Sequence, residues 1–321
     1  MNARHFLMAL AAGIALAAVA DSGAAPGWTD VLDTPAVRSP LAARGLLNGL
    51  ARAGGRIVAV GQRGHILWSD NAGQDWQQAS VPASSDLVAV HFPTPAKGWA
   101  VGHDGVVLHT ADAGKSWTRQ RDGRPDAADV PLLDVWFRDD RHGYAVGAFG
   151  TLLETRDGGA SWGATQLADN PKKLHLYAVR PVGDDLWIAG EQGLLLKMDR
   201  ASGRFVAVAL PYQGTLFGVT GTASAVLVHG LRGNVLRSSD GGANWQPVAT
   251  NVQVGITASA VDGGRILLAS QAGHLFVSSD DGAKFSAVAL ERPFPAAAVL
   301  GTAPGRVLVA GPRGVLAQPL P

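Results

Sequence analysis

The chain has 321 residues, with 27 Lys and Arg against 26 Asp and Glu. This balance argues against a nucleic-acid-binding protein, because phosphate binding normally requires a basic excess gathered on one face. Cys is absent, which excludes disulfide bonds and a lipid-modified N-terminal Cys.

Residues 1–20 have the composition of a secretory signal peptide. Arg4 precedes an apolar run over residues 6–19, and Ala18-Val19-Ala20 offers small residues at the positions that a signal peptidase reads. Cleavage after Ala24 and a short N-terminal helix packed on the domain are the alternatives. No later segment has the roughly 18 uninterrupted apolar residues of a membrane-spanning helix. We therefore expect a periplasmic protein with no integral membrane segment after cleavage.

One unit returns seven times between residue 46 and the C-terminus. Aligned on a Gly-x-x-Gly turn, the units begin that turn at Gly61, Gly102, Gly147, Gly190, Gly230, Ser270 and Gly311. A unit of about 40 residues with four short strands cannot bury its own apolar faces, so the copies must stack. The sequence therefore predicts one all-β domain over residues 21–321, a seven-bladed β-propeller of four-stranded blades.

A second motif, Ser/Thr-x-Asp-x-Gly-x-Ser/Thr-Trp, connects the third and fourth strands of most units. A short carboxylate can accept hydrogen bonds from turn amides, Gly can adopt a left-handed conformation, and the indole can cover the hairpin. Calcium binding is the alternative, but one carboxylate per motif falls short of the six to eight oxygens that calcium prefers. We predict no metal and no cofactor, and we assign a structural role to Asp112, Trp117, Asp157, Trp162, Asp240 and Trp245.

The fourth and seventh units depart from this pattern. In the fourth unit the motif decays to Met198, Arg200, Ser202 and Phe205. The seventh unit ends after three strands, whereas Trp28 resembles the aromatic residue that opens a fourth strand. We expect the N-terminal strand around Trp28 to complete the last blade, because this would remove open strand edges. A disordered N-terminal tail is the alternative.

The second motif resembles the Asp-box, or BNR, repeat. Together with the preceding Gly-x-x-Gly turn, it makes residues 27–321 similar to the photosystem II assembly and stability factor-like propeller family, and the run from Leu133 to Gly147 is especially typical. The resemblance implies a seven-bladed propeller that binds other proteins and helps to assemble membrane complexes, without catalysis. It also implies that some exported bacterial members associate with RND-type exporters. The degenerate fourth unit departs from the family pattern.

The repeat also sorts residues between two edges of the ring. Turns between the second and third strands share one edge with the connectors between blades, and the Asp boxes lie on the other. On the first edge, the junction of blades seven and one brings together five arginines, next to acidic residues that include Asp86, Asp104, Asp126 and Asp129. Arginine suits carboxylate-rich partners, so we predict a site for a protein partner of the cell envelope on a monomeric propeller, with the charges as solubilising groups as the alternative. The five arginines are Arg38, Arg44, Arg63, Arg292 and Arg313.

A sialidase-like carbohydrate-active or carbohydrate-binding propeller is the second hypothesis, because Asp boxes also occur in sialidases. Such an enzyme needs an arginine cluster, a Tyr nucleophile beside a Glu, and an acidic proton donor. Tyr177 and Glu191 fall on the same blade and could meet. However, the chain holds only three Tyr, and its connectors are too short to wall a deep pocket. The sequence therefore favours a non-enzymatic interaction protein.

Overall fold

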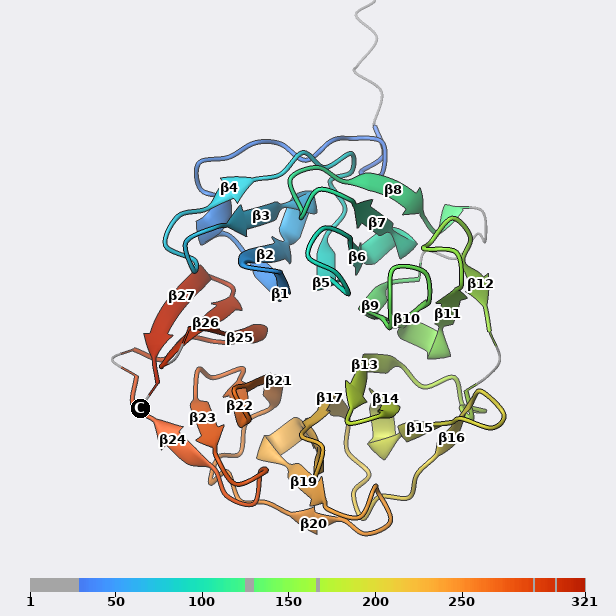
Figure 1. Ribbon diagram of the computed structural model, residues 1–321, viewed down its shortest axis with the longest axis vertical. Coiled ribbons are helices and arrows are strands. Elements are labelled where there is room, and N and C mark those ends of the chain that lie inside the picture. Colours follow the sequence, from blue (N-terminus) through green and yellow to red (C-terminus); the bar gives the residue numbers. More distant parts are fainter. Residues whose placement is uncertain (1–28, 125–129, 166–167, 291, 304, 321) are drawn as a thin grey trace, which may run out of the picture.

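The computed structural model describes residues 29–124, 130–165, 168–290, 292–303 and 305–320, and its strands form seven antiparallel sheets arranged in a ring (Figure 1). Six sheets have four strands, and the sheet β25-β26-β27 has three. The predicted all-β, seven-bladed propeller is therefore confirmed. Residues 1–20, the predicted signal peptide, lie outside the described residues. Within the described ranges, no helix is long and apolar enough to cross a bilayer.

The two inner strands of each blade supply most of the core. The second strands are buried on both faces because each blade is covered by its neighbours, and their sequences accordingly read as short continuous apolar runs. The innermost strands are β1 (Leu47–Ala53), β5 (Leu87–His91), β9 (Leu132–Phe137), β13 (Leu176–Val182), β17 (Leu216–Gly221), β21 (Ile256–Asp262) and β25 (Ala298–Ala303). The second strands are β2 (Arg56–Gly61), β6 (Gly98–Gly102), β10 (Gly143–Gly147), β14 (Asp185–Gly190), β18 (Val226–Gly230), β22 (Arg265–Ser270) and β26 (Arg306–Gly311).

The outer strands are shorter and more exposed. The third strands are β3 (Ile66–Ser69), β7 (Val107–Thr110), β11 (Leu152–Thr155), β15 (Leu195–Asp199), β19 (Val235–Ser238), β23 (Leu275–Ser278) and β27 (Gly314–Pro319). The fourth strands are β4 (Gln77–Gln78), β8 (Thr118–Arg121), β12 (Gly163–Ala164), β16 (Arg204–Ala207), β20 (Gln246–Pro247) and β24 (Ser286–Val288). Short fourth strands leave little unpaired edge at the circumference, which limits edge-to-edge association.

Glycine is required for different reasons at the two ends of the Gly-x-x-Gly turn. Gly64 has φ of +68°, which disfavours any residue with a Cβ, whereas Gly61 has φ of −170° and is extended. At Gly61 the constraint is space, because a Cβ would lie 2.1 Å from the Leu46 carbonyl oxygen. Five of the blades close this turn as a short 3-10 segment: η2 (Gln62–Gly64), η3 (His103–Gly105), η5 (Ala148–Gly150), η6 (Glu191–Gly193) and η7 (Leu231–Gly233).

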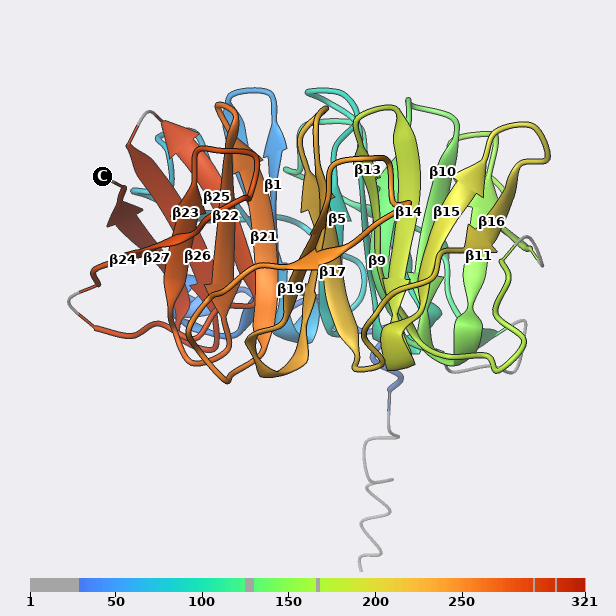
Figure 2. The same cartoon turned by 90° about the horizontal axis from the view of Figure 1, so that it is seen from below.

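The ring has two distinct edges, seen side-on in Figure 2. We call connector rim the edge formed by the turns between second and third strands together with the connectors between blades. The opposite edge, the box rim, carries the turns between first and second strands and the Asp boxes. Contacts support this division, since Gly64 of the first blade abuts Ala83 of the following connector, and Gly193 abuts Tyr212.

The Asp boxes are compact hydrogen-bonded turns. Asp112 Oδ1 accepts hydrogen bonds from the Lys115 and Ser116 amides, both at 3.0 Å, and Oδ2 accepts one from the Ser116 hydroxyl at 2.6 Å. The Trp117 indole donates to the Gly114 carbonyl at 3.1 Å, and its side chain is buried. Asp240 accepts equivalent bonds from Asn244, and the Trp245 indole donates to Gly242. Asp157 accepts from Ser161, while Trp162 is partly buried against Phe137.

The described part of the predicted N-terminal strand, residues 29–33, does not lie in the last blade. Trp28 lies outside the described residues, but residues 29–45 run along the outside of the first two blades, and the seventh blade keeps three described strands (Figure 1). Asp30 Oδ1 accepts the Leu32 amide, which bends the chain into a turn rather than a strand. Leu32 is buried against the first two blades, and Asp33 pairs with Arg119 and Arg124. Burial of Leu32 and this ion pairing favour the observed path.

The ring closes instead by side-chain packing. Strand β1 lies against β25 and β26, and η1 (Ala42–Arg44) lies against β27. Ala42 and Leu47 share a buried cluster with Ala310 of the seventh blade. The junction between first and last blades is therefore held by apolar burial in the same way as the other junctions.

Candidate functional site

The connector rim presents large side chains from strained turn positions. At the third position of five Gly-x-x-Gly turns, a residue other than Gly has φ between 53° and 57°. Such left-handed conformations are uncommon for residues with a long side chain and are often found where function requires them. Asp104 is partly buried, and its carboxylate accepts a hydrogen bond from the Ser85 hydroxyl. The other four residues are exposed at the turn tips: Arg63, Phe149, Gln192 and Arg232.

Apolar side chains are also exposed on this rim. Phe149 is 63% exposed at its turn tip, and Leu41, in the segment before β1, is 61% exposed. Leu231, the first residue of η7, is also exposed on this rim. Apolar groups exposed among charged ones are typical of surfaces that bind other proteins.

The structure brings three of the five predicted arginines to one place. Arg313 donates to the Pro293 carbonyl at 2.6 Å and lies over the Phe294 ring, which places it beside the adjacent Arg292. Gly314 approaches the backbone of Arg44 so closely that a Cβ would lie 2.9 Å from the Arg44 Cα. Arg44, Arg292 and Arg313 therefore gather at the junction of the seventh and first blades.

The other two predicted arginines lie further along the first blade. The Arg63 amide donates to Asp86 Oδ1 at 2.6 Å, so this turn adjoins the acidic residues of the second blade. Arg38 is flanked by Val37 and Ser39, which both bond Gln78 of the outer strand β4. All five side chains are exposed, and within the described ranges none forms a salt bridge. Asp126 and Asp129 lie outside the described residues.

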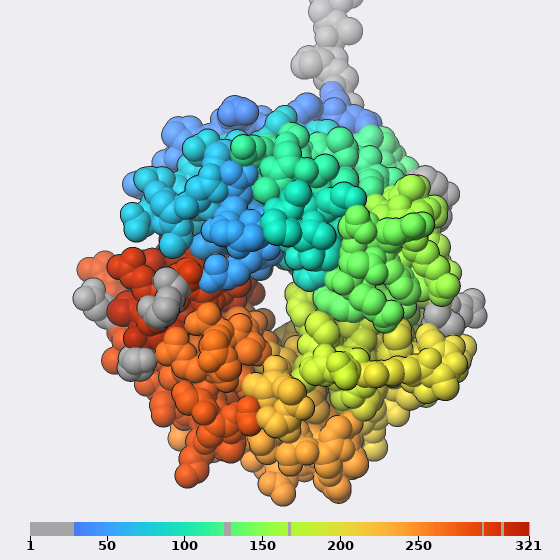
Figure 3. Space-filling view, in the orientation of Figure 1, coloured from blue at the N-terminus to red at the C-terminus, as the bar shows by residue number. Residues whose placement is uncertain are grey.

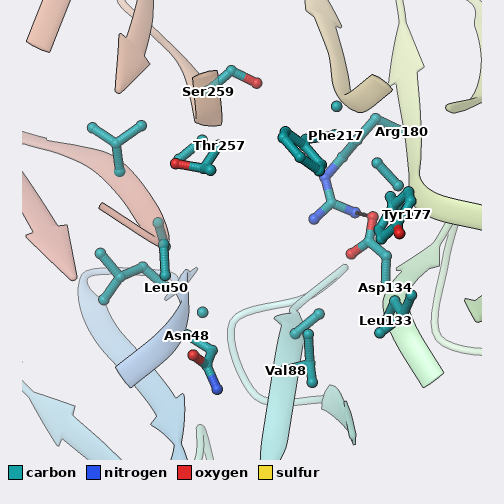
Figure 4. A pocket seen from close by; sticks show the side chains of 18 of the residues that line it. Asn48, Leu50, Val88, Leu133, Asp134, Tyr177, Arg180, Phe217, Thr257 and Ser259 are labelled. Atoms are coloured by element: carbon teal, nitrogen blue, oxygen red, sulfur yellow. Dashed lines mark hydrogen bonds and ion pairs between the residues drawn. The ribbon is translucent and has the colours of Figure 1, made fainter. Parts of the chain in front are cut away.

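The centre of the ring is open, as Figure 3 shows. The innermost strands of all seven blades line a cavity of about 290 Å³. Asn48, Thr257, Ser259 and the rings of Tyr177 and Phe217 are among its lining groups (Figure 4). This mixed lining makes the channel a second place where a ligand can be accommodated.

An ion pair between the buried Asp134 and the partly exposed Arg180 joins the third and fourth blades at the channel wall. Asp134 accepts hydrogen bonds from the Val135 amide at 2.9 Å and the Val179 amide at 2.8 Å, and its Oδ2 also accepts from Arg180 (Figure 4). Burial raises the pKa of the Asp134 carboxyl, and the Arg180 guanidinium opposes that rise. The pair joins two innermost strands, so its first effect is to fix the junction between these blades.

Sequence reasoning missed Asp134 and Arg180, although a signal was present. Each is the charged residue of an otherwise largely apolar innermost strand, Leu132–Phe137 and Leu176–Val182. A charge at such a position needs a partner, since unpaired burial is costly. Finding two opposite charges on adjacent predicted strands would have suggested the pair.

The sialidase-like arrangement is not favoured by the geometry. Tyr177 lies in the channel with its ring against Phe217, and burial raises the pKa of its hydroxyl, with the charge of Glu191 as the second cause. Glu191 instead accepts a hydrogen bond from the His175 amide at 3.0 Å. A tyrosine nucleophile needs a hydroxyl pKa that is lowered, not raised, and a carboxylate in contact with the hydroxyl to remove its proton. In the described part of the chain, no three His, Asp or Glu side chains are grouped to hold a metal ion.

Solved structures with the same architecture include two of the YCF48 type. The structure described as "YCF48 bound to D1 peptide" has 17% sequence identity and a TM-score of 0.71, covering 89% of this chain and 96% of its own. YCF48 from Cyanidioschyzon merolae has 18% identity and a TM-score of 0.69, covering 89% of this chain and 98% of its own. The WD40 propeller domain of Doa1 is nearly as similar in structure, with a TM-score of 0.66 at 8% identity. These likenesses establish the fold.

The sequence comparisons establish the family. The photosystem II stability/assembly factor HCF136 of Oryza sativa subsp. japonica is 36% identical over 66 residues, which are 19% of this chain and 16% of the rice protein. The match thus spans about a sixth of the length of this curated relative. The sequence model of the family described as "Photosynthesis system II assembly factor YCF48" matches residues 40–124 and 126–285, more than half of the chain. The resemblance predicted from the Asp boxes is confirmed: the chain belongs to the YCF48 assembly-factor family.

Proposed function

We propose that this protein is a non-catalytic assembly factor that docks a protein partner of the cell envelope through its connector rim. Membership of the assembly-factor family supports the general role, and a solved relative is described as bound to a peptide. The observation that carries the choice of rim is the set of four long, exposed side chains held at left-handed turn positions on that edge, those of Arg63, Phe149, Gln192 and Arg232. Glycine would fit these positions without strain, so their side chains indicate a use outside the fold.

The basic sector (Arg38, Arg44, Arg63, Arg292 and Arg313) is the proposed centre of the interface. Its side chains are exposed, and the acidic Asp86 beside Arg63 gives the rim charges of both signs at the junction of the first and second blades. A partner with complementary charges would bind in one orientation, because like charges would meet in the others. The proposal includes periplasmic residence and association with a membrane complex such as an RND-type exporter, which the export signal and family resemblance suggest.

Site-specific photo-crosslinking tests the interface. A photoreactive phenylalanine analogue replaces Phe149 or Arg63 on the connector rim, and Val206 or Val261 elsewhere serves as a matched exposed position. In the bacterium that produces the protein, we expect one envelope protein to crosslink from the two rim positions and not from the two controls. Crosslinking to the same protein from Val206 or Val261 alone would reject the proposed face, and a cytoplasmic partner would reject the location.

A further inference from the structure

The box rim is sealed at most blade junctions by the Asp-box glycine. In four boxes a Cβ at this position would lie 2.4 to 3.0 Å from a second-strand side chain of the preceding blade, so even a methyl group has no room. Gly242 meets Trp187 in this way, and Gly282 meets Leu227. The remaining contacts of this kind pair Gly73 with Leu308 and Gly114 with Val58.

The fourth blade, which lacks the box, leaves its junction with the third blade unsealed. Its turn is built on Asp199, whose carboxylate accepts the Ala201 and Ser202 amides, one residue earlier than the box Asp of other blades. The hairpin therefore runs on to Arg204 opposite Asp199 and stands at the upper edge of Figure 2. A Cβ on Gly203 would meet no atom within 4 Å. The turn thus stands away from the preceding blade instead of packing on it.

A cavity of about 530 Å³ lies at this junction. Its apolar lining consists of Leu186 and Met198 of the fourth blade, together with the Tyr144 ring of the third. Phe205 packs edge-on against Tyr144, which takes the place of the missing Trp and keeps the core closed beneath the cavity. The space above is therefore the volume that a box turn occupies at other junctions.

Cationic side chains border this cavity. Arg138 is exposed and, within the described ranges, forms no salt bridge. Arg200 uses Nη2 to donate to the Asp184 carbonyl at 2.6 Å and to Asp185 Oδ1 at 3.3 Å, while its side chain remains 62% exposed. His142 also lines the cavity and is hydrogen-bonded to Glu154 at 2.8 Å. Asp184 is the one acidic residue of the described lining. Asp185, just outside it, is shared between Arg200 and Lys197, so in the described part of the chain the Arg138 guanidinium is left without a carboxylate partner and that of Arg200 is only partly neutralised.

From this combination of an apolar floor and two guanidinium groups, we propose that the junction of the third and fourth blades binds a carboxylate carried on an apolar body. The apolar part would lie on Leu186 and Met198, and the carboxylate would reach Arg138 and Arg200. Their planar guanidinium groups can form bidentate hydrogen bonds with a carboxylate. This site lies on the box rim, so it is independent of the connector-rim interface. The carboxylate could belong to a small molecule or to an acidic side chain of an extended peptide.

Methyl NMR of the full chain can observe this site directly. The sequence has three methionines, and the other two are Met1 and Met8, so Met198 is the only methyl-thioether in the propeller. With ¹³C-methyl methionine, a Met198→Leu variant assigns the signal. We expect 3-phenylpropionate to shift the Met198 resonance saturably with a Kd of about 1 mM or tighter, and the neutral 3-phenylpropionamide to bind at least about tenfold more weakly.

Two variants decide whether the arginines are responsible. Arg138→Ala combined with Arg200→Ala should abolish the shift while leaving the NMR spectrum of the fold intact. Arg141→Ala combined with Arg306→Ala removes two exposed arginines of the same rim outside the cavity and should leave binding unchanged. Equal binding of acid and amide, or no shift of Met198 by either the acid or the peptide acetyl-Ala-Phe-Glu-Ala-amide, would overturn the proposal. Tighter binding of the peptide than of 3-phenylpropionate identifies a peptide as the source of the carboxylate, and the reverse identifies a small molecule.

Discussion

The two rims of the propeller have similar backbone strain but very different side chains. On the box rim, the left-handed residue before the box glycine is small or bonded within the fold. It is Ala72, Ala113, Gly158 or Gly241 in four blades, and in a fifth it is Asp281, which accepts hydrogen bonds from Thr222 and Ser224 of the preceding blade. The corresponding residues of the connector rim include Arg63, Phe149 and Arg232, all exposed.

This difference separates the part of the sequence that maintains the fold from the part that is available for recognition. The box rim also carries charged residues that form salt bridges with each other, such as Arg56 with Asp70 at 2.6 Å and Lys97 with Asp140 at 2.7 Å. Its polar groups are largely satisfied inside the molecule. The arginines of the basic sector have no such carboxylate partner in the described part of the chain, and that leaves them available to a second protein.

The largest contrast should come from replacing an aromatic residue on each rim. Trp117→Ala removes a buried indole and should lower the free energy of unfolding by about 3–5 kcal/mol. Phe149→Ala removes an exposed ring from a turn that keeps its conformation, and the change should stay within about 0.5 kcal/mol. Denaturant unfolding monitored by circular dichroism measures both. Similar losses in the two variants would show that the rims do not differ in this way.

A second comparison separates conformation from packing at two glycines. Gly203 and Gly242 both have positive φ, at 68° and 96°, but only Gly242 contacts the preceding blade. Gly203→Ala should cost about 1 kcal/mol from the conformation alone. Gly242→Ala should cost a further 1–3 kcal/mol or so, because its methyl group meets the Trp187 ring. Thermal unfolding of the two variants tests this order. Equal costs would contradict the inference that the fourth-blade turn does not pack on the third blade.

The box carboxylates predict a smaller, acid-dependent effect. Hydrogen bonds from Ser161 lower the pKa of Asp157 to about 2, and those from Asn244 lower the pKa of Asp240 to about 2, from an ordinary value of 3.8. A carboxyl with a lowered folded-state pKa stabilises the fold above its unfolded-state pKa and loses that contribution as the pH falls. The melting temperature should therefore decline as the pH falls from about 4 to about 2.

The matching variant for this pH effect is Asp157→Asn with Asp240→Asn. Asparagine keeps an acceptor oxygen for the turn amides but has no titrating proton. The double variant should melt lower at neutral pH and show a shallower decline in melting temperature over the acid range. A decline as steep as that of the wild type would mean that other carboxyl groups control acid stability.

The sequence allowed the ring and its two rims to be predicted because each blade repeats the same local chemistry. Gly61 and Asp112 recur at fixed spacing, so their roles could be read once and applied around the ring. The path of the N-terminal segment could not be predicted in this way. It depends on the burial of Leu32 and on the ion pairs of Asp33 with Arg119 and Arg124, single contacts over long sequence distances that no repeat encodes.

The two candidate sites also differ in how far they could be predicted from the repeat. The basic sector was predicted from ring geometry, and the structure does gather Arg44, Arg292 and Arg313, while Arg38 follows the outer strand. The cavity over Tyr144 was not predicted, although the decay of the fourth box was visible in the sequence. A missing motif reveals that packing is lost but not whether other side chains fill the space. That depends on where Arg200 and Gly203 lie in three dimensions.

The separation of the two rims is tested most directly by measuring stability and partner binding together in two charge-reversed proteins. Arg63→Glu with Arg313→Glu changes the connector rim, and Asp240→Lys with Asp280→Lys changes two Asp boxes. We expect the first protein to unfold like the wild type and to lose about tenfold or more in affinity for the crosslinked envelope partner. The second should lose stability but, below its melting temperature, bind the partner like the wild type. Undiminished binding by the Arg63→Glu/Arg313→Glu protein, with an unchanged salt dependence, would contradict the account and direct attention to the acidic residues around Asp104.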